Sequence, residues 1–558
     1  MAAAYPEKAV PRATNSVRPI ALAVAYAFAG GAPAWAAPQG EQVVAGQAAV
    51  SRAGAGTLIT QGSERAAINW QSFSIGAGES VRFAQPSSSS VTLNRVVGQN
   101  PSEILGSLSA NGQVFLINPN GVLFGKGARV DVGGLVASTM GISNSDFMAG
   151  RYRFSADGVT AGGAQVVNAG DILANGGYVA LIGPQVTNSG SITAAGGSVT
   201  LAAGEQVTLN LNGNKLIGLT VEKGALNALA DNKGLIRADG GQVLLTAKAA
   251  DQLIKSVVNN DGIVEAGTLK NVNGVIRLEG DSIANSGVLR ADGGANQNGG
   301  SISLVSANDT TLAAGSAISA SGARGGDITV QASGGTLHAS GRIETTGNDG
   351  AGGTIKLLGE RVGLMAGAAV DASGARGGGA VLVGGDYQGS NARVQNAQRT
   401  YVDAAAAIKA DAAASGDGGK VIVWADDVTR FYGTISAQGG AASGNGGTVE
   451  VSGKGTLDFN GSVNTLAANG RAGTLLLDPT NIEVVTGGAY RCGCLCRCRS
   501  DDLHRIRRRS LQPHRAGHHQ RGGRHGNPAG EQQHHIHQRC QHRHGWRRLE
   551  RYRDHWHH

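Results

Sequence analysis

A short phrase recurs along most of this chain: two glycines, any residue, an apolar residue, any residue and a second apolar residue. Alternating apolar positions place every second side chain on one face, which is the pattern of a β-strand. A strand with two inward residues buries too little surface alone, so the copies must stack on one another. The repeat therefore predicts an all-β fold, a right-handed parallel β-helix. The glycine pairs stand at Gly176-Gly177, Gly196-Gly197, Gly240-Gly241, Gly299-Gly300, Gly325-Gly326, Gly352-Gly353, Gly378-Gly379, Gly418-Gly419 and Gly446-Gly447.

A second phrase marks corners between the strands. It consists of Asn, any residue, Gly and a short strand, and it begins at Asn168, Asn188 and Asn285. The gap between the second and third glycine pairs is roughly twice the gap between the first and second, so we interpret it as two coils. Coils of about 22 residues predict about 20 coils between Ala37 and Tyr490.

Composition agrees with a thin, repetitive core. Glycine accounts for 89 of 558 residues and aromatic residues for 4%, without the strict Gly-X-Y period of collagen. Leucine-rich and propeller repeats need spacings or aromatic signatures that do not occur, and the calcium-binding nonapeptide does not recur.

The carboxy-terminal tail, 491–558, differs from the rest of the chain. It holds 16 Arg and 5 acidic residues, and +8 overall minus +11 in this tail leaves −3 for the preceding chain. Because the excess of basic residues is confined to the tail, the positive net charge of the whole chain does not indicate nucleic-acid binding by the body, and we predict no nucleic-acid partner for it. All five cysteines and 13 of the 14 histidines also lie in the tail.

Two interpretations of this tail stay open. The coil repeat stops after Tyr490, lysine disappears, and Arg, His and Cys increase together, as in a GC-rich gene read in a shifted frame. In that case the chain is a truncated form of a longer protein. The alternative is a metal-binding appendage, although the alternating CxCxCxC of Cys492, Cys494, Cys496 and Cys498 fits structural zinc poorly. Either way the tail lacks the repeat, and we expect it to be disordered.

The start of the chain has the order of a secretory signal peptide. Basic residues precede an apolar segment from Ile20 to Ala29, and small residues follow in Ala34-Trp35-Ala36. The sequence predicts a signal peptide over residues 1–36, cleaved between Ala36 and Ala37, and export by the Sec translocon. No second apolar stretch approaches the length of a membrane span.

Several motifs stand in order between the predicted cleavage site and the repeats. An apolar run ends at the turn Asn118-Pro119-Asn120-Gly121, after the phrases Ile68-Asn69-Trp70-Gln71-Ser72-Phe73-Ser74-Ile75-Gly76, Asn94-Arg95-Val96 and Ser109-Ala110-Asn111-Gly112. This region resembles the haemagglutination and secretion domain of the filamentous haemagglutinin family, exoproteins of two-partner secretion. Distal phrases such as 416–433 and 475–482 look like the shafts of such adhesins.

The resemblance implies a domain plan and a function. It implies a secretion domain over residues 37–165, a β-helical shaft over 166–490, and Asn118, Pro119, Asn120 and Gly121 as a secretion motif. It further implies an outer-membrane β-barrel transporter as partner and a location outside a Gram-negative bacterium or on its surface. Host or bacterial surface glycans or receptors would be the targets of such an adhesin.

Enzymatic alternatives find little support in the body of the chain. A β-helical enzyme acting on surface polysaccharide would need convergent acids, whereas Asp327, Asp371, Asp386, Asp417 and Asp426-Asp427 are predicted to be solvated corner acids. The segment 416–420 lacks phosphate-loop spacing. His338 is the only histidine before the tail, so we predict no catalytic residue, metal site or cofactor there.

Overall fold

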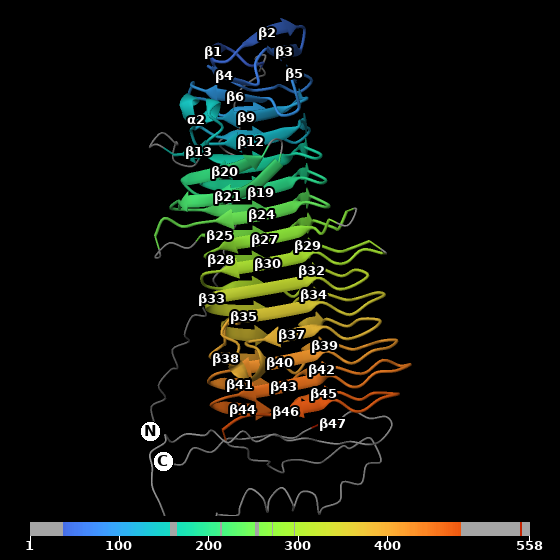
Figure 1. The fold of residues 1–558 in the computed structure, drawn as a ribbon. Coiled ribbons are helices and arrows are strands. Elements are labelled where there is room, and N and C mark those ends of the chain that lie inside the picture. Colours follow the sequence, from blue (N-terminus) through green and yellow to red (C-terminus); the bar gives the residue numbers. More distant parts are fainter. Residues whose placement is uncertain are drawn as a thin grey trace, which may run out of the picture. The chain divides into compact units, whose positions relative to one another are not determined.

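Three ladders of parallel strands, wound by one chain, make up this protein (Figure 1). The computed structural model describes residues 37–156, 164–212, 215–251, 256–269, 272–294, 296–480 and 547–548. In most coils the chain gives one strand to each ladder and then climbs to the next coil, where each strand pairs with its equivalent. The prediction of a parallel β-helix is confirmed.

The three ladders are formed as follows. The first contains β4 (Arg65–Trp70), β6 (Val91–Val96), β9 (Gln113–Ile117), β12 (Gly134–Ser138), β16 (Tyr178–Gly183), β19 (Ser198–Ala203), β24 (Gln242–Ala247), β27 (Val275–Gly280), β30 (Ser301–Ser306), the first parts of β33 (Asp327–Ala339) and β35 (Thr354–Leu364), β37 (Ala380–Val383), β40 (Lys420–Ala425), β43 (Thr448–Gly453) and β46 (Thr474–Leu476). The second contains β7 (Ser102–Ile104), β10 (Val122–Phe124), β14 (Gln165–Asn168), β17 (Gln185–Asn188), β22 (Leu229–Asn232), β25 (Val257–Asn260), β28 (Ser282–Asn285), β31 (Thr310–Leu312), the second parts of β33 and β35, β38 (Arg399–Val402), β41 (Val428–Phe431) and β44 (Thr456–Phe459). The third contains β3 (Gly56–Gln61), β5 (Ser80–Ala84), β8 (Ser107–Ala110), β11 (Arg129–Asp131), β15 (Asp171–Leu173), β18 (Ser191–Thr193), β23 (Leu235–Arg237), β26 (Ile263–Glu265), β29 (Val288–Arg290), β32 (Ala317–Ser319), β34 (Arg342–Glu344), β36 (Ala369–Asp371), β39 (Ala407–Lys409), β42 (Thr434–Ser436) and β45 (Ser462–Asn464), which also pairs antiparallel with β47 (Arg547–Arg548).

The apolar residues of the repeat phrase point into the coils. Val199 and Leu201 of β19 stack on Val243 and Leu245 of β24, and all four side chains are buried. The same alignment continues along each ladder, so the inward Val, Ile, Leu and Ala residues form one continuous core. Each coil therefore buries its apolar residues against its neighbours, as the repeat predicted.

Asparagines form a second interior column at the corner after the second ladder. The Asn168 side-chain amide donates to Asn188 Oδ1, Asn188 donates to Asn232, Asn232 to Asn260, and Asn260 to Asn285, each over 2.8 Å. All five side chains are buried, so each amide needs this partner. The sequence reasoning found three of these corners and missed Asn232 and Asn260, which also stand two residues before a glycine.

Glycine is required in the repeat phrase because the coils approach closely. A β-carbon on Gly197 would overlap the carbonyl oxygen of Gly177, and one on Gly353 would overlap that of Gly326. Neither glycine has a positive φ, so close backbone approach, not the left-handed region, excludes a side chain there.

The predicted coil number is wrong in two respects. β19 pairs directly with β24, so the long gap between Gly197 and Gly241 is a single coil that contains an inserted hairpin. Later coils are also longer than assumed, because Gly326 and Gly353 are neighbours in the stack and stand farther apart in the sequence than Gly177 and Gly197 do. The chain therefore makes fewer coils than about 20.

Antiparallel strands close the amino-terminal end of the coils. β1 (Gln42–Ala45) pairs antiparallel with β4, and β2 (Ala48–Ala53) forms a hairpin with β3. These strands occupy the edges that the first parallel coil would otherwise expose, which protects the stack from edge-to-edge association.

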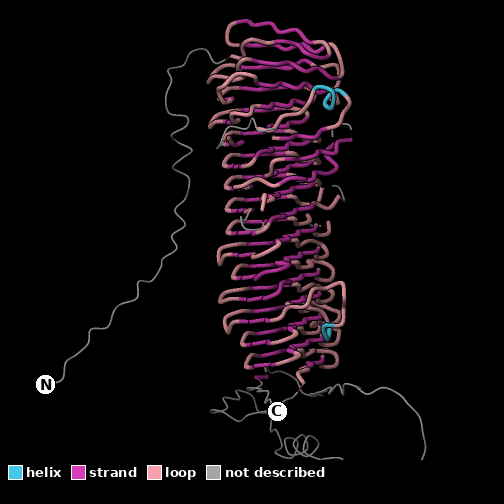
Figure 2. Tube along the Cα trace, turned by 90° about the vertical axis from the view of Figure 1, so that its left-hand side faces the viewer, coloured by secondary structure: helices cyan, strands magenta, loops and turns pink. Residues whose placement is uncertain are grey.

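Two insertions lie on the outer face of the first ladder. The first, which we name the cover, comprises α2 (Asn144–Met148) and the antiparallel strands β13 (Tyr152–Ser155), β20 (Gln206–Asn212) and β21 (Lys215–Lys223). The second, the distal loop, spans 384–398 and contains the 3-10 helix η1 (Tyr387–Gly389). Figure 2 shows the two short helices outside the coils, on the same side of the stack.

The predicted signal peptide with Ala36 of the cleavage site, residues 481–490 of the predicted shaft, and all of the tail except 547–548 lie outside the described residues. Their predictions therefore stay predictions.

Candidate functional site

The turn Asn118–Gly121 forms the corner between β9 and β10. Its backbone closes with a hydrogen bond from Gly121 N to Asn118 O, 3.0 Å long, and Gly121 adopts a φ of +122°. The Asn118 Oδ1 atom accepts the Asn120 backbone N–H at 3.0 Å, which is an Asx-turn. Pro119 has no backbone N–H, and the turn does not need one at this position. The local geometry of the turn therefore accounts for each residue type of the motif.

Side chains of this turn also hold the preceding coil. The Asn118 amide is fully buried and donates to Asn100 O and Ser102 Oγ, both at 3.0 Å. The Asn120 amide donates to Gly98 O at 2.9 Å. The motif therefore joins two successive coils at one corner, and the Asn118 amide would be left unpaired in the interior if these acceptors moved.

The motif at residues 68–76 provides the aromatic core of the first coils. Trp70 and Phe73 are both buried and meet edge to face, with ring centroids 5.4 Å apart. The Trp70 indole N–H donates to the buried Asn94 Oδ1 at 3.1 Å. Asn94, from the motif at residues 94–96, therefore supplies the hydrogen-bond acceptor that the buried indole needs. These two motifs were separate in the sequence and share one interior site.

Arg95 connects the same two motifs to the cover. Its guanidinium donates to Asn69 Oδ1 at 3.2 Å, to Asn144 Oδ1 at 2.8 Å and to Ile142 O at 2.5 Å. Burial lowers the pKa of Arg95, and the three acceptors compensate for its lost hydration. One side chain thus holds the start of α2 against β4.

The motif at residues 109–112 forms another corner around Gln85. Asn111 and Gln85 exchange two hydrogen bonds of 2.8 Å through the asparagine side chain and the glutamine backbone. The Gly112 N–H donates to Gln85 Oε1 at 2.9 Å, and a β-carbon on Gly112 would lie 2.6 Å from Ser90 O. Glycine is therefore needed at this position.

The cover creates a second core on the outside of the first ladder. Phe115 points outward from β9 and packs against Phe147, Tyr152 and Phe154, with ring centroids 5.2–6.2 Å away. Tyr178 lies fully buried beside them, and its hydroxyl donates to Gln113 Oε1 at 2.6 Å. Desolvation raises the pKa of Tyr178 well above its usual value, so the hydroxyl stays protonated as a donor.

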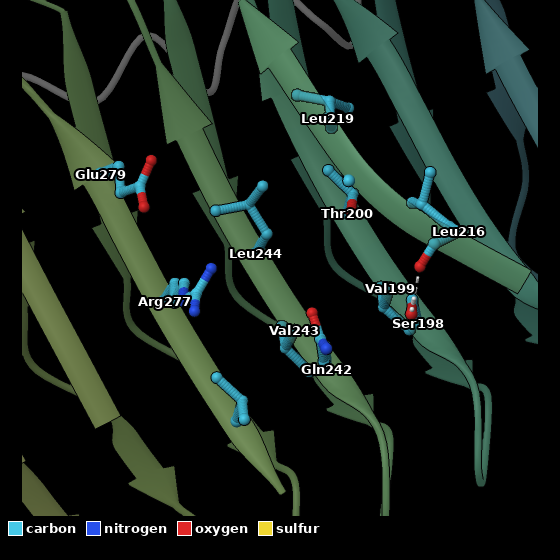
Figure 3. A pocket seen from close by; sticks show the side chains of 12 residues that line it. Ser198, Val199, Thr200, Leu216, Leu219, Gln242, Val243, Leu244, Arg277 and Glu279 are labelled. Carbon is cyan, nitrogen blue, oxygen red and sulfur yellow. Dashed lines mark hydrogen bonds between the residues drawn. The ribbon is translucent and has the colours of Figure 1, made fainter. Parts of the chain in front are cut away.

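A hollow of about 120 Å³ opens where the cover ends. Figure 3 shows Leu216 and Leu219 of β21 on one side and Leu244, Arg277 and Glu279 of the next coils on the other. The lining lacks a convergent set of buried polar groups, so it offers a shallow, mixed surface and no evident chemistry.

Several sequence-predicted positions have specific partners. Lys420 of the 416–420 segment donates to Asp386 at 2.9 Å, and Gly419 abuts Gly379 of the preceding coil, so this segment is a repeat corner. The prediction that Asp386 and Asp426 are solvated acids is wrong. Asp386 also accepts a hydrogen bond from the Asn391 amide. Burial alone would raise the pKa of Asp386, but the hydrogen bonds from Asn391 and Lys420 outweigh burial and lower this pKa to about 2. Asp426 accepts the Trp424 indole N–H at 2.9 Å.

Sequence reasoning missed the cover altogether. Its strands carry no glycine-pair phrase, and β20 and β21 lie inside a gap that we assigned to an extra coil. A signal was nevertheless present in β9, where Val114-Phe115-Leu116-Ile117 are consecutive apolar residues. An unbroken apolar run indicates a strand that is buried on both faces.

Neither a metal cluster nor a membrane helix is found among the described residues. No group of three or more His, Cys, Asp or Glu side chains in these ranges gathers to hold an ion. Within the same ranges, no helix is long and apolar enough to cross a membrane.

Comparisons with known proteins place these coils in context. Residues 34–304 match the family model described as the TPS secretion domain. Two Haemophilus influenzae proteins, both named heme/hemopexin-binding protein, are 37% identical over 251 residues and 35% identical over 267 residues. Each alignment covers 44% of this chain, and the chain spans only 27% and 28% of the lengths of these relatives. The crystal structure of the HMW1 secretion domain from Haemophilus influenzae is 31% identical, with a TM-score of 0.49 over 75% of this chain and 95% of that one.

Proposed function

This chain is a two-partner secretion exoprotein, with its TPS secretion domain in residues 34–304, and from that premise we propose that it is an adhesin that attaches cells to surfaces or to one another. Exoproteins of this type are secreted from Gram-negative bacteria with the help of an outer-membrane transporter. The proposal goes further in three respects: attachment as the role, surface glycans or receptors as the targets, and Sec export through the peptide 1–36. If the tail results from a shifted reading frame, the intact protein would be a longer adhesin.

The observation that carries the proposal is a structural difference between the amino-terminal coils and the coils that follow them. The amino-terminal coils contain the motif corners and the cover, whereas central coils such as that of β30 repeat one phrase with a bare outer face. A stack that repeats the same phrase in successive coils suits a long display surface. Glu450, Asp386 and Asp478 are close enough beneath the distal loop to influence one another, but Glu450 is buried and Asp386 is bound by Lys420 and Asn391, so an enzyme acting on polysaccharide is the weaker candidate.

We further propose that the 118–121 corner is a secretion motif. The side chains of Asn118 and Asn120 fix the geometry of two coils at once, and Asn118 is the more deeply buried of the two. Replacing Asn118 by Ala would leave its former partners unpaired and cost about 1–3 kcal/mol. The prediction is that Asn118→Ala and Asn120→Ala lose most of their extracellular protein.

The test is secretion from cells that also make the outer-membrane transporter, measured as the extracellular fraction of the protein. Asn285→Ala is the matched control, because Asn285 is equally buried and also donates to a corner carbonyl, that of Gly287. Loss for the two motif variants with normal export of Asn285→Ala supports the motif. Unchanged secretion of Asn118→Ala and Asn120→Ala would refute it.

A further inference from the structure

Ring side chains that are not buried gather in one place. Among the described residues, every Trp and Phe is buried, and His338, Tyr387, Tyr401 and Tyr432 are the His and Tyr side chains that are not. Three of these four lie on the outer face of the second ladder and the corner beside it. Exposed aromatic surface is scarce elsewhere in these coils, so its concentration here calls for an explanation.

Strand register places this surface on one line. Outward positions in successive coils are occupied by His338, Gly363, Tyr401, Arg430 and Asp458. Neighbouring strands of a ladder are about 4.8 Å apart, so the five positions form a continuous row. We name this set, together with Tyr432 and Met365, the tyrosine row.

The two tyrosines are held in fixed orientations. Their rings meet edge to face with centroids 5.9 Å apart. The Tyr401 hydroxyl donates to Asp403 at 3.0 Å, and the Tyr432 hydroxyl donates to Asp458 at 2.7 Å. Partial burial and the bond to Asp458 raise the pKa of Tyr432 to about 12, so the phenol remains a neutral donor. Rings that are already fixed lose little entropy when a ligand binds.

Gly363, between His338 and Tyr401 in the row, is buried beneath neighbouring side chains. A β-carbon there would lie 3.0 Å from Met365 Sδ and 3.6 Å from His338 Cδ2. The surface over Gly363 is therefore formed in part by an imidazole and a thioether, and Met365 itself is 36% exposed. A flat group lying on this surface would contact soft, polarisable atoms.

The row and its neighbours carry charges of both signs. Arg430 lies close enough to both tyrosines to oppose the rise of their phenol pKa values, while Asp403 and Asp458 supply carboxylates. One arginine and two aspartates leave a net charge of only −1, beside hydrogen-bond donors, acceptors and aromatic faces. A strongly charged partner would find little complementary field here.

We propose that the tyrosine row binds an extended neutral glycan, whose sugar rings lie along the ladder with their C–H faces against Tyr401, Tyr432 and His338. Sugar hydroxyls would bond to Arg430 and to the two aspartates. An extended glycan presents successive rings along one line, as the ladder presents successive side chains. This inference rests on the proposed adhesin function and names its ligand class.

The experiment is affinity electrophoresis of the full secreted chain in gels that contain a neutral galactan, glucan or mannan, with heparin and hyaluronan as charged comparators. We expect at least one neutral polysaccharide to retard the wild type. Tyr401→Ala and Tyr432→Ala should each weaken retention about tenfold, as expected for an aromatic residue at the centre of a contact. His338→Ala, an exposed position, tests the row without risk to the core.

The matched control is Tyr387→Ala, because Tyr387 is 38% exposed but lies in the distal loop and outside the row. Its retention should equal that of the wild type. Retention by heparin or hyaluronan alone, no retention by any polysaccharide, or equal retention of the Tyr401, Tyr432 and His338 variants would each overturn the proposal.

Cell attachment separates this inference from the proposed function. If cells displaying the wild type attach and the row variants attach equally well, the tyrosine row is not the binding surface while the adhesin role stands. If the wild type supports no attachment but its neutral-glycan retention is lost in the row variants, the row binds glycan and the adhesin role is wrong.

Discussion

The outer face of the first ladder differs between the amino-terminal and the central coils. Following one row of paired positions, Phe115 is succeeded by Val136 and Ala180 beneath the cover, and all three are buried. Farther along the same row come Arg277 and then Thr329, where no cover is present. Because the inward faces are alike, the outer face decides which strands become apolar on both sides.

The row turns apolar again under the distal loop. Leu382 and Ile422 are buried there and form a small cluster with Trp424. The next position is Glu450, which is also buried. Apolar outward residues therefore mark insertions that pack on the ladder, and bare coils such as that of Thr329 carry polar residues at this position.

The largest expected effect is at the centre of the cover. Phe115→Ala should destabilise the amino-terminal coils by about 3–5 kcal/mol, since it removes a buried ring that three aromatic residues surround. The matched control is Thr329→Ala, at the same row position on a bare strand, where a change within about 0.5 kcal/mol is expected. Urea unfolding of both variants measures the difference.

Equal destabilisation by these two substitutions would contradict the comparison, because it would mean that the cover contributes nothing to the outer face.

A smaller effect is expected from Glu450 beneath the distal loop. Burial raises its pKa to about 7, and the charges of Asp478 and Asp386 add to this, against hydrogen bonds from Gln388 N–H and the Ser452 side chain. Lys420, the nearby cation, is already paired with Asp386 at 2.9 Å. The neutral carboxyl is therefore the form that the folded chain favours.

The sign of the pH dependence follows from that shift. A carboxyl with a pKa raised from 4.5 to about 7 contributes its stability fully below pH 4.5 and loses it as the pH rises through 7. The distal coils should be about 2–3 kcal/mol less stable at pH 8 than at pH 5. Glu450→Gln should remove most of this difference in thermal or urea unfolding. A difference that persists unchanged in the variant would show that other groups cause it.

The coil architecture was predictable because its cause is local. Each glycine-pair phrase carries its own alternation, and residues such as Val199 and Leu201 occupy the inward positions that the phrase assigned. The four motif segments could likewise be located, but not their shared contacts, because the bond from Trp70 to Asn94 joins different coils.

The insertions were not predictable from the same pattern. The hairpin β20–β21 lacks the glycine-pair phrase. The sequence gap that contains it is about two coils long, so we counted an extra coil there. Asp386 looked like a corner acid because its partners, Lys420 and Asn391, are fixed only by the path of the distal loop. Long-range packing of this kind leaves its trace in neighbouring strands, in runs such as 114–117 and 421–424, more than in the insertion itself.

Amide hydrogen exchange tests the central claim, that the cover protects the amino-terminal coils more strongly than the bare central coils are protected. Backbone amides of β9 and β30 both lie in parallel ladders, but only β9 is buried on both faces. We predict markedly slower exchange in the 113–117 peptide than in the 301–306 peptide, because its amides require opening of the cover as well as the coil. Equal exchange, or faster exchange in β9, would contradict the account.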